Sequence, residues 1–348
     1  MHPMTVMCVA AVIAAPIIAL SAHAADDGPY HVLRIVKVGG EGGFDYVKAD
    51  AEARRLYITR HGKPPEVDVF DLDTLKQVGV IPDVGAAGAI ADPKSGHGFA
   101  SSNPVTMFDA RTLMKIKAIP VDSHPDDLMV DAFNDRLYVW SHTPPYGTVI
   151  DALTGDVLGT MDVGGAVEES VSDGAGHVYV AFDNNGSIAV VDASTMKVTA
   201  HYPLLAKDDN CGGLAIDTKN RILFAGCRDK KVMVVLSADT GKIITTLPLP
   251  DISTDGEGFN QETLENFSSH ANGTLTVIKE NSRTDFVVEQ TVKTIDNGKA
   301  MAFDSRTGHV FVTGAEYLPA APNAVRFKGR PPRGPMVPGS FSIVEIGR

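Results

Sequence analysis

Basic side chains are scarce in this sequence relative to acidic ones, and the imbalance limits the partners that the protein can have. Lys and Arg together number 31 against 43 Asp and Glu, which gives a formal net charge of -12. Binding to nucleic acid or to an anionic membrane surface needs gathered positive charge. The composition therefore argues against both and suits a soluble protein whose ligand is neutral or cationic.

The sequence motifs of several large enzyme classes are also missing. The pattern contains no serine nucleophile elbow, Walker loop or dinucleotide-binding fingerprint. It has no H-E-x-x-H zinc motif and no C-x-x-C-H, so covalent haem is not indicated. We therefore assign no catalytic residue from motifs.

The long apolar run of the chain lies at its beginning, over Val6–Leu20, and is followed by the small residues of Ser21–Ala24. A run of this length is too short for a comfortable membrane span. The pattern predicts a secretory signal peptide over residues 1–24. We expect a periplasmic or secreted protein that has no membrane span after cleavage.

The remaining sequence is dominated by a repeat. One copy, His124–Gly159, holds four short strand-forming segments separated by turn residues. An Asp that ends the first segment recurs about 40 residues apart, and an Asn replaces it once. These anchor residues are Asp50, Asp92, Asp131, Asp173, Asp217, Asn260 and Asp304. Four strands at this spacing are typical of a propeller blade, so seven anchors predict seven blades.

The two ends of the repeat array are incomplete in complementary ways. His31–Val38 alternates like a strand but precedes the first anchor, and Ser340–Ile346 has no outer strand after it. We therefore predict an all-β fold, a seven-bladed β-propeller of four-stranded antiparallel blades, in which the N-terminal strand pairs into the last blade and closes the ring. Residues 25–348 form one domain in this interpretation, with a Pro-rich insertion over residues 316–339.

Two cysteines, Cys211 and Cys227, lie in the fifth repeat on either side of its hairpin. A hairpin that turns at Asp217 brings the start of its first strand beside the end of its second. We expect a disulfide, which export would permit. A pair of soft metal ligands or a redox couple are the alternatives.

Several segments resemble a known family. They are "RLYIT", "LAIDTKNRILFAGC", "GTLTVIKE", "MAFDSRTGHVFVTGAEY" and "MVPGSF", and they are similar to exported YncE-like proteins of the YVTN-repeat β-propeller family. The resemblance covers essentially the whole mature chain and implies the propeller fold. It implies little about function, because related propellers include lactonases, lyases, cofactor domains of oxidoreductases and binding modules.

Matching positions of the seven repeats should meet around the central channel. The positions five residues before the anchors, here called the ring positions, are Asp45, Ala87, Asp126, Glu168, Gly212, Asp255 and Lys299. Four of the seven are acidic. Tyr46, Asp127 and Glu169 adjoin them in sequence. The pattern predicts an acidic ring at the mouth of the channel, on the face here called the top face.

Carboxylates gathered in this way repel one another, so the ring needs raised pKa values, a counter-ion such as Lys299, or a bound cation. Oxygen-rich clusters suit hard ions such as Ca²⁺ or Mg²⁺. A divalent cation is the one cofactor that the pattern suggests. Its candidate ligands are Asp45, Asp126, Glu168 and Asp255. The alternative is that the carboxylates lie far apart and are solvated.

The ends of the second strands should bring further side chains to the same face: Arg60, His61, His142, Arg228 and His270. Histidines near carboxylates can bind Zn²⁺ or act as general bases. The alternative is that they are ordinary turn histidines, because no motif fixes their spacing.

Two functions follow from these patterns. The first is an exported, monomeric, non-catalytic propeller that binds a small ligand, a cation or a protein partner over its top face. The second is a metal-assisted hydrolase or lyase, acting for instance on lactones, that uses the same carboxylates and a histidine.

Overall fold

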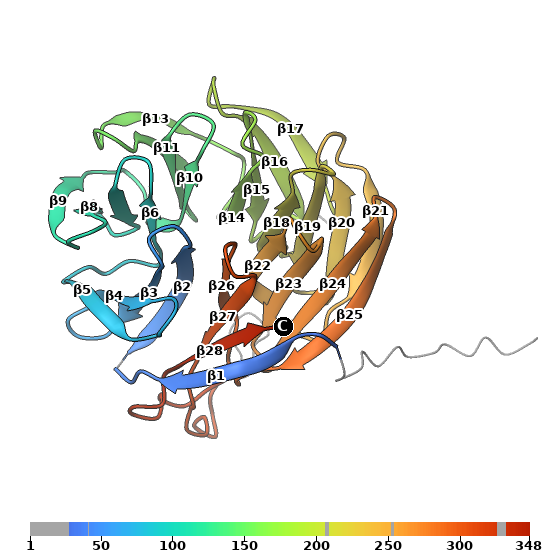
Figure 1. The fold of residues 1–348 in the computed structure, drawn as a ribbon. Coiled ribbons are helices and arrows are strands. Elements are labelled where there is room, and N and C mark those ends of the chain that lie inside the picture. Colours follow the sequence, from blue (N-terminus) through green and yellow to red (C-terminus); the bar gives the residue numbers. More distant parts are fainter. Residues whose placement is uncertain (1–27, 41, 206–208, 252–253, 326–331) are drawn as a thin grey trace, which may run out of the picture.

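The computed structural model describes residues 28–40, 42–205, 209–251, 254–325 and 332–348. These residues form seven four-stranded sheets, which are arranged in a ring (Figure 1). None of the described residues forms a helix that could span a membrane. The structure therefore confirms the predicted seven-bladed propeller. The predicted signal peptide lies outside the described residues.

Each blade has one innermost strand. These are β2 (Gly43–Asp50), β6 (Ala89–Asp92), β10 (Pro125–Asp131), β14 (Val167–Ser172), β18 (Gly213–Asp217), β22 (Thr254–Asn260) and β26 (Ala300–Asp304). The second strands are β3 (Arg55–His61), β7 (His97–Ala100), β11 (Arg136–Ser141), β15 (His177–Phe182), β19 (Ile222–Cys227), β23 (Glu265–His270) and β27 (His309–Gly314). Neighbouring innermost strands contact each other all the way round the ring.

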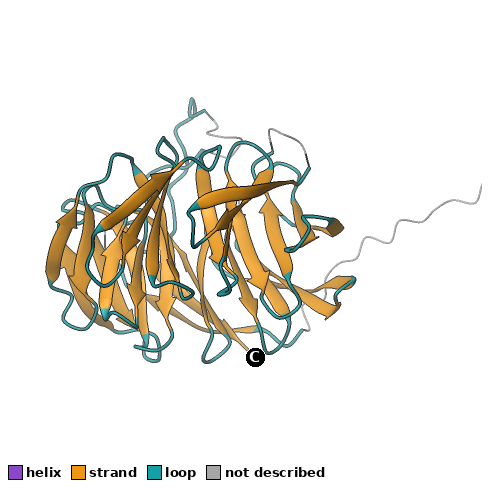
Figure 2. Cartoon of the chain, turned by 90° about the horizontal axis from the view of Figure 1, so that it is seen from above, coloured by secondary structure: helices purple, strands orange, loops and turns teal. Residues whose placement is uncertain are grey.

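The outer half of each blade is equally regular. The third strands are β4 (Glu66–Asp71), β8 (Val105–Asp109), β12 (Gly147–Asp151), β16 (Ser187–Asp192), β20 (Val232–Ser237), β24 (Thr274–Ser282) and β28 (Ser342–Gly347). The outermost strands are β5 (Gln77–Pro82), β9 (Lys115–Ile119), β13 (Val157–Met161), β17 (Lys197–Pro203), β21 (Ile243–Pro248), β25 (Asp285–Lys293) and β1 (His31–Lys37). Figure 2 shows the sheets standing side by side when the ring is seen from its edge.

The anchor residue of each repeat closes the turn after the innermost strand. In β18, Oδ1 of Asp217 accepts hydrogen bonds from the backbone N–H groups of Lys219 and Asn220, at 2.8 and 3.1 Å. The Asn260 amide oxygen does the same in the sixth blade, for Glu262 and Thr263. Because the side-chain oxygen is what the turn needs, the one Asn among the anchors preserves the chemistry of the repeat.

The core lies between adjacent blades. Aromatic side chains of the second strands, such as Tyr57, Tyr138, Tyr179 and Phe311, are fully buried. One buried cluster joins Tyr138 and Trp140 of β11 to Val178 and Val180 of the next blade. Burial of apolar surface on both faces of every sheet holds the blades against each other.

The N-terminal strand closes the ring, as the sequence predicts. β1 pairs antiparallel with β28 in register from His31 opposite Gly347 to Lys37 opposite Ser342. The residue before β1, Tyr30, is fixed to the sixth blade by Gln290, which bonds both its backbone N–H, at 2.9 Å, and its carbonyl, at 2.8 Å. The pairing joins the N-terminal strand to the last blade, and Gln290 joins the residue before it to the sixth blade.

β27 ends at Gly314 and β28 begins at Ser342, so the Pro-rich segment lies between the second and third strands of the last blade. Its described residues contact the outer part of that blade. Glu316 lies 3.4 Å from Lys37 of β1, and Tyr317 pairs with Met336 across the base of the segment.

Replacement of Tyr30 tests the closure. The ring of Tyr30 is buried, lies edge-on to Phe267 with the ring centroids 5.1 Å apart, and its hydroxyl donates a hydrogen bond to Glu265. We expect Tyr30→Ala to lower the free energy of unfolding by about 3 kcal/mol, as for other large buried side chains. Urea denaturation measures this loss.

The matched control is Leu33→Ala on the exposed face of β1, where the side chain is 47% exposed. This variant should unfold close to the wild-type midpoint. Equal effects of the two substitutions would show that the Tyr30 contacts do not hold the ring closed.

Candidate functional site

The charged ring positions lie close together at one end of the innermost strands, where the sequence predicts the channel mouth, and a chain of ion pairs connects them. Lys299 pairs with Asp255 and lies 4.0 Å from Asp45. Arg228 links Asp255 to Glu168. We call the connected side chains the mouth cluster: Asp45, Asp126, His142, Glu168, Arg228, Asp255 and Lys299. The predicted carboxylates therefore lie close together, and most of them have a cationic partner.

One corner of the mouth cluster combines a histidine with two carboxylates. Nε2 of His142 lies 3.2 Å from Oε2 of Glu168 and 3.5 Å from Oδ2 of Asp126. One potential ligand atom from each of the three residues lies within 4.8 Å of the others. The Tyr46 hydroxyl donates to the Glu168 carbonyl at 2.7 Å and lies 3.2 Å from Oδ2 of Asp126. Three potential ligand atoms from two neighbouring blades, the third and the fourth, thus converge on one small volume.

Arg228 occupies the opposite side of Glu168. Its Nη2 lies 2.6 Å from Oε1 of Glu168 and 2.7 Å from Oδ1 of Asp255, and Nη1 lies 3.1 Å from Oδ1 of Asp183. The Arg228 side chain is only 4% exposed. A guanidinium in this geometry offers several directed donors at once. It neutralises carboxylates that would otherwise repel one another.

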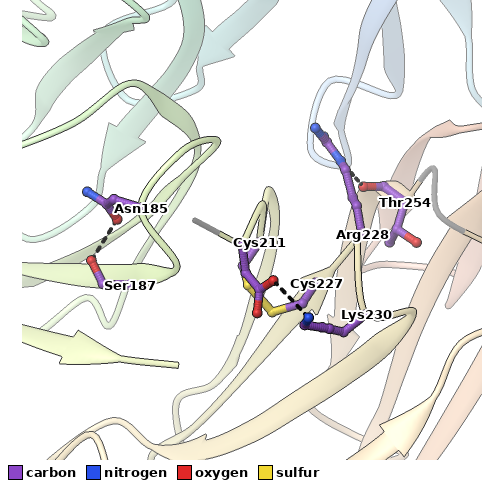
Figure 3. Close-up of a disulfide and its surroundings, with 8 residues drawn as sticks. Asn185, Ser187, Cys211, Cys227, Arg228, Lys230 and Thr254 are labelled. Carbon is purple, nitrogen blue, oxygen red and sulfur yellow. Dashed lines mark hydrogen bonds and ion pairs between the residues drawn. A yellow bond between two sulfur atoms is a disulfide. The ribbon is translucent and has the colours of Figure 1, made fainter. Parts of the chain in front are cut away.

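The disulfide and a glycine determine where Arg228 lies. Cys211 and Cys227 are bonded, which confirms the predicted pair, and Arg228 follows Cys227 directly (Figure 3). Nε of Arg228 donates to the Thr254 carbonyl at 2.9 Å, as the dashed line in Figure 3 shows. A Cβ at the ring position Gly212 would lie 2.6 Å from Nη2 of Arg228 and 2.7 Å from Cγ of Glu168. Glycine therefore makes room for this ion pair.

Burial and mutual contact shift the pKa values of the cluster in opposite directions. Burial raises the pKa of Asp126 to about 7, although nearby His142 opposes the rise. Burial acts on Glu168 too, but Arg228 and the bond from His142 outweigh it and hold the pKa of Glu168 below its usual range. The hydrogen bond to Glu168 raises the pKa of His142. Burial and ion pairing thus shift the pKa values of the two carboxyl groups at this corner in opposite directions.

A second group of side chains lies next along the innermost strands, and we call it the inner cluster: Lys48, Asp127, Glu169 and Glu257. Nζ of Lys48 lies 3.0 Å from Oδ1 of the fully buried Asp127. Oε2 of Glu169 accepts the backbone N–H of Leu214 at 2.9 Å. Burial raises the pKa of Glu169 to about 8 and that of Glu257 well above its ordinary value. Burial also raises the pKa of Asp127, although Lys48 beside it opposes the rise.

The remaining predicted site residues lie outside these two clusters. Arg60 is buried with its guanidinium 3.8 Å from the centroid of the Phe341 ring. Both ring nitrogens of the buried His270 are bonded to threonine hydroxyls, those of Thr254 at 2.8 Å and Thr276 at 2.9 Å. Burial lowers the pKa of His270 to about 3, so it is a neutral core histidine. His61 is exposed and bonds the Ala86 carbonyl at 3.2 Å.

Asp183 and Lys48 contribute to the site but were not predicted from the sequence. Asp183 is the first residue after β15, just as His142 and Arg228 directly follow β11 and β19. The sequence analysis considered only Arg and His at the ends of the second strands. Including acidic side chains at the same position would have predicted Asp183. Lys48 lies two residues before its anchor, and no positional rule singled it out.

Comparison with known proteins supports the fold and adds no family. No family model matches the sequence, and no curated protein matches it significantly. A chain of the Kuenenia stuttgartiensis hydrazine synthase has 12% identity and a TM-score of 0.67, over 78% of this chain and 92% of that one. A chain of a mitotic checkpoint complex has 11% identity and a TM-score of 0.70, over 89% and 96%. At these identities the likeness shows the propeller fold alone.

The buried Glu257 makes stability depend on pH. The folded protein keeps a proton on Glu257 that the unfolded chain loses above a pH of about 4.5, so stability falls as the pH rises, by up to about 1.4 kcal/mol per pH unit. Glu257→Gln retains an acceptor for the Ser268 hydroxyl and removes the titration. We expect the variant to lose less stability than wild type between pH 5 and pH 8 in thermal unfolding.

The control is Glu262→Gln, which removes an exposed carboxylate beyond the end of β22. Its pH profile should follow that of wild type. Parallel profiles for all three proteins would contradict the raised pKa of Glu257.

Proposed function

We propose that this chain is an exported YncE-like protein of the YVTN-repeat family whose channel mouth binds a divalent transition-metal ion through Asp126, His142 and Glu168. The observation that carries the proposal is the convergence of one donor atom from each residue within 4.8 Å. Propellers commonly serve as binding scaffolds, and the proposed position lies near the starts of the innermost strands β10 and β14.

The chemistry of the donors favours a first-row transition metal over Ca²⁺ or Mg²⁺. Imidazole nitrogen suits zinc and its neighbours, whereas Ca²⁺ takes six to eight oxygen ligands. Only Oε2 of Glu168 faces His142, because Oε1 is held by Arg228. A bound dication would also stabilise the ionised form of Asp126, whose burial disfavours its charge.

Export is supported by the disulfide between Cys211 and Cys227. Disulfides persist mainly in proteins of oxidising compartments. Together with the predicted signal peptide over residues 1–24, this favours a periplasmic or secreted protein. The family assignment depends on the sequence segments quoted above and on the seven blades.

A metal-assisted hydrolase or lyase is the second candidate. The observation that favours it is the carboxyl group of Asp126, whose Oδ2 lies 3.5 Å from Nε2 of His142. Burial raises the pKa of Asp126 to about 7, a range useful for general acid–base catalysis. A metal ion at this corner would supply Lewis-acid polarisation of a substrate oxygen. Turnover of a lactone that is abolished by a chelator would separate this enzyme from a binding protein.

Zn²⁺ titration of the mature protein tests the proposal. We expect one tight site by isothermal titration calorimetry, with affinity that rises from pH 6 to pH 8 because Asp126 and His142 lose protons on binding. His142→Gln removes the nitrogen ligand and should weaken binding at least about 100-fold, since loss of an outer-shell partner alone costs roughly 10–100-fold.

The matched control is His201→Gln, an exposed histidine on the outermost strand β17. It should leave the affinity unchanged. Zn²⁺ binding that is equally weakened by both substitutions, or by neither, would contradict the proposed site.

A further inference from the structure

We infer that Arg228 is the specificity-determining residue of the mouth cluster: it excludes Ca²⁺ and Mg²⁺ and leaves a site for a first-row transition metal. The inference rests on the proposed function and goes beyond it, because Arg228 is not itself a metal ligand. The argument concerns which carboxylate oxygens remain available to an ion.

Arg228 forms ion pairs with carboxylate oxygens that could otherwise bind a metal ion. It holds Oε1 of Glu168 at 2.6 Å, Oδ1 of Asp255 at 2.7 Å and Oδ1 of Asp183 at 3.1 Å. The other oxygen of Asp255, Oδ2, pairs with Lys299. An ion at the His142 corner is therefore offered one oxygen of Glu168 together with Asp126.

Ca²⁺ needs many oxygen ligands and commonly takes carboxylates in bidentate fashion. Without the Arg228 guanidinium, both oxygens of Glu168 would be free, and Asp183 and Asp255 would lose a counter-charge on the same side of the channel. That arrangement is an oxygen-rich, strongly negative cluster of the kind that hard cations prefer. The guanidinium thus converts an acidic cluster into a small mixed nitrogen and oxygen site.

The position of Arg228 is fixed from several directions. The Cys211–Cys227 disulfide holds the preceding residue, and the backbone N–H of Arg228 donates to the Asn210 carbonyl at 2.7 Å. The Thr254 carbonyl accepts from Nε at 2.9 Å. Gly212 leaves the space that the guanidinium and the Glu168 side chain fill. Such preorganisation is what a specificity residue requires.

The experiment measures the Kd values of Zn²⁺ and Ca²⁺ for the mature protein by calorimetry, in wild type and in Arg228→Met. We expect the ratio of the Ca²⁺ Kd to the Zn²⁺ Kd to fall at least about tenfold in the variant, because oxygen ligands are released and the nitrogen ligand is unchanged. The ratio is the decisive quantity, because loss of a positive charge strengthens the binding of any cation.

Arg221→Met is the matched control. Arg221 also bridges two carboxylates, with 2.6 Å to Asp173 and 2.9 Å to Asp239, but it lies beside the turn that follows β18. Like Arg228→Met, the Arg221→Met substitution removes one positive charge and a similar set of ion pairs. Its ratio of Kd values should equal that of wild type.

Gly212→Ala is the second variant, and it decides the question if Arg228→Met does not fold. The new methyl group would meet side-chain atoms of Arg228 and Glu168, so it separates the pair without removing a charge. We expect the same direction of change in the ratio.

The outcomes separate the two claims. If wild type binds neither ion, the proposed function fails and this inference fails with it. If wild type binds Zn²⁺ and the ratio is unchanged in the variants that fold, the role of Arg228 is overturned while the proposed function stands.

Discussion

The pairing of β1 with β28 closes the ring, and the site depends on that closure. Innermost strands from neighbouring blades contact one another around the whole circle, so each strand carries its ring position to the same end of the channel. One buried hydrophobic cluster, in which Tyr30 lies edge-on to Phe267, and the Gln290 contacts hold Tyr30 and the strand that follows it in place. If the last blade lacked its outermost strand, β28 would present an unpaired edge and the alignment of the first and last blades would be lost.

Carboxylates that lie close together repel one another, and the mouth cluster and the inner cluster offset this repulsion in different ways. At the mouth, Arg228 and Lys299 supply positive charge, and the carboxylates stay close without all being neutral. In the inner cluster, Lys48 compensates Asp127, while burial keeps Glu169 and Glu257 protonated. Among the residues that the structure describes, Asp126, His142 and Glu168 form the corner at which potential ligand atoms face each other with no lysine or arginine between them. This difference is why the proposed ion is placed there.

The fold could be predicted from the sequence because the repeat is regular and because the chemistry of the turn explains why each anchor is an Asp or an Asn. An Asp or Asn is needed to close the turn after the innermost strand, so the anchors count the blades, and Asn260 counts as one of them. The convergence of Asp126, Glu168 and Asp255 follows from the same periodicity.

The periodicity of the sequence does not predict the direction in which each side chain points. His270 occupies a second-strand end like its counterparts, yet it turns into the core and bonds two threonines. Arg228 was expected to bind a ligand, and its recorded contacts are instead with carboxylates of the protein and with the backbone. Such choices depend on packing between blades that are distant in sequence.

The central claim is that two neighbouring blades together form one metal position at the channel mouth. Anomalous diffraction from crystals grown with Zn²⁺, recorded on both sides of the zinc absorption edge, tests it most directly. The account predicts one strong peak within coordination distance of Asp126, His142 and Glu168. A map without a peak at that position, or with peaks only at exposed histidines such as His201, would contradict it.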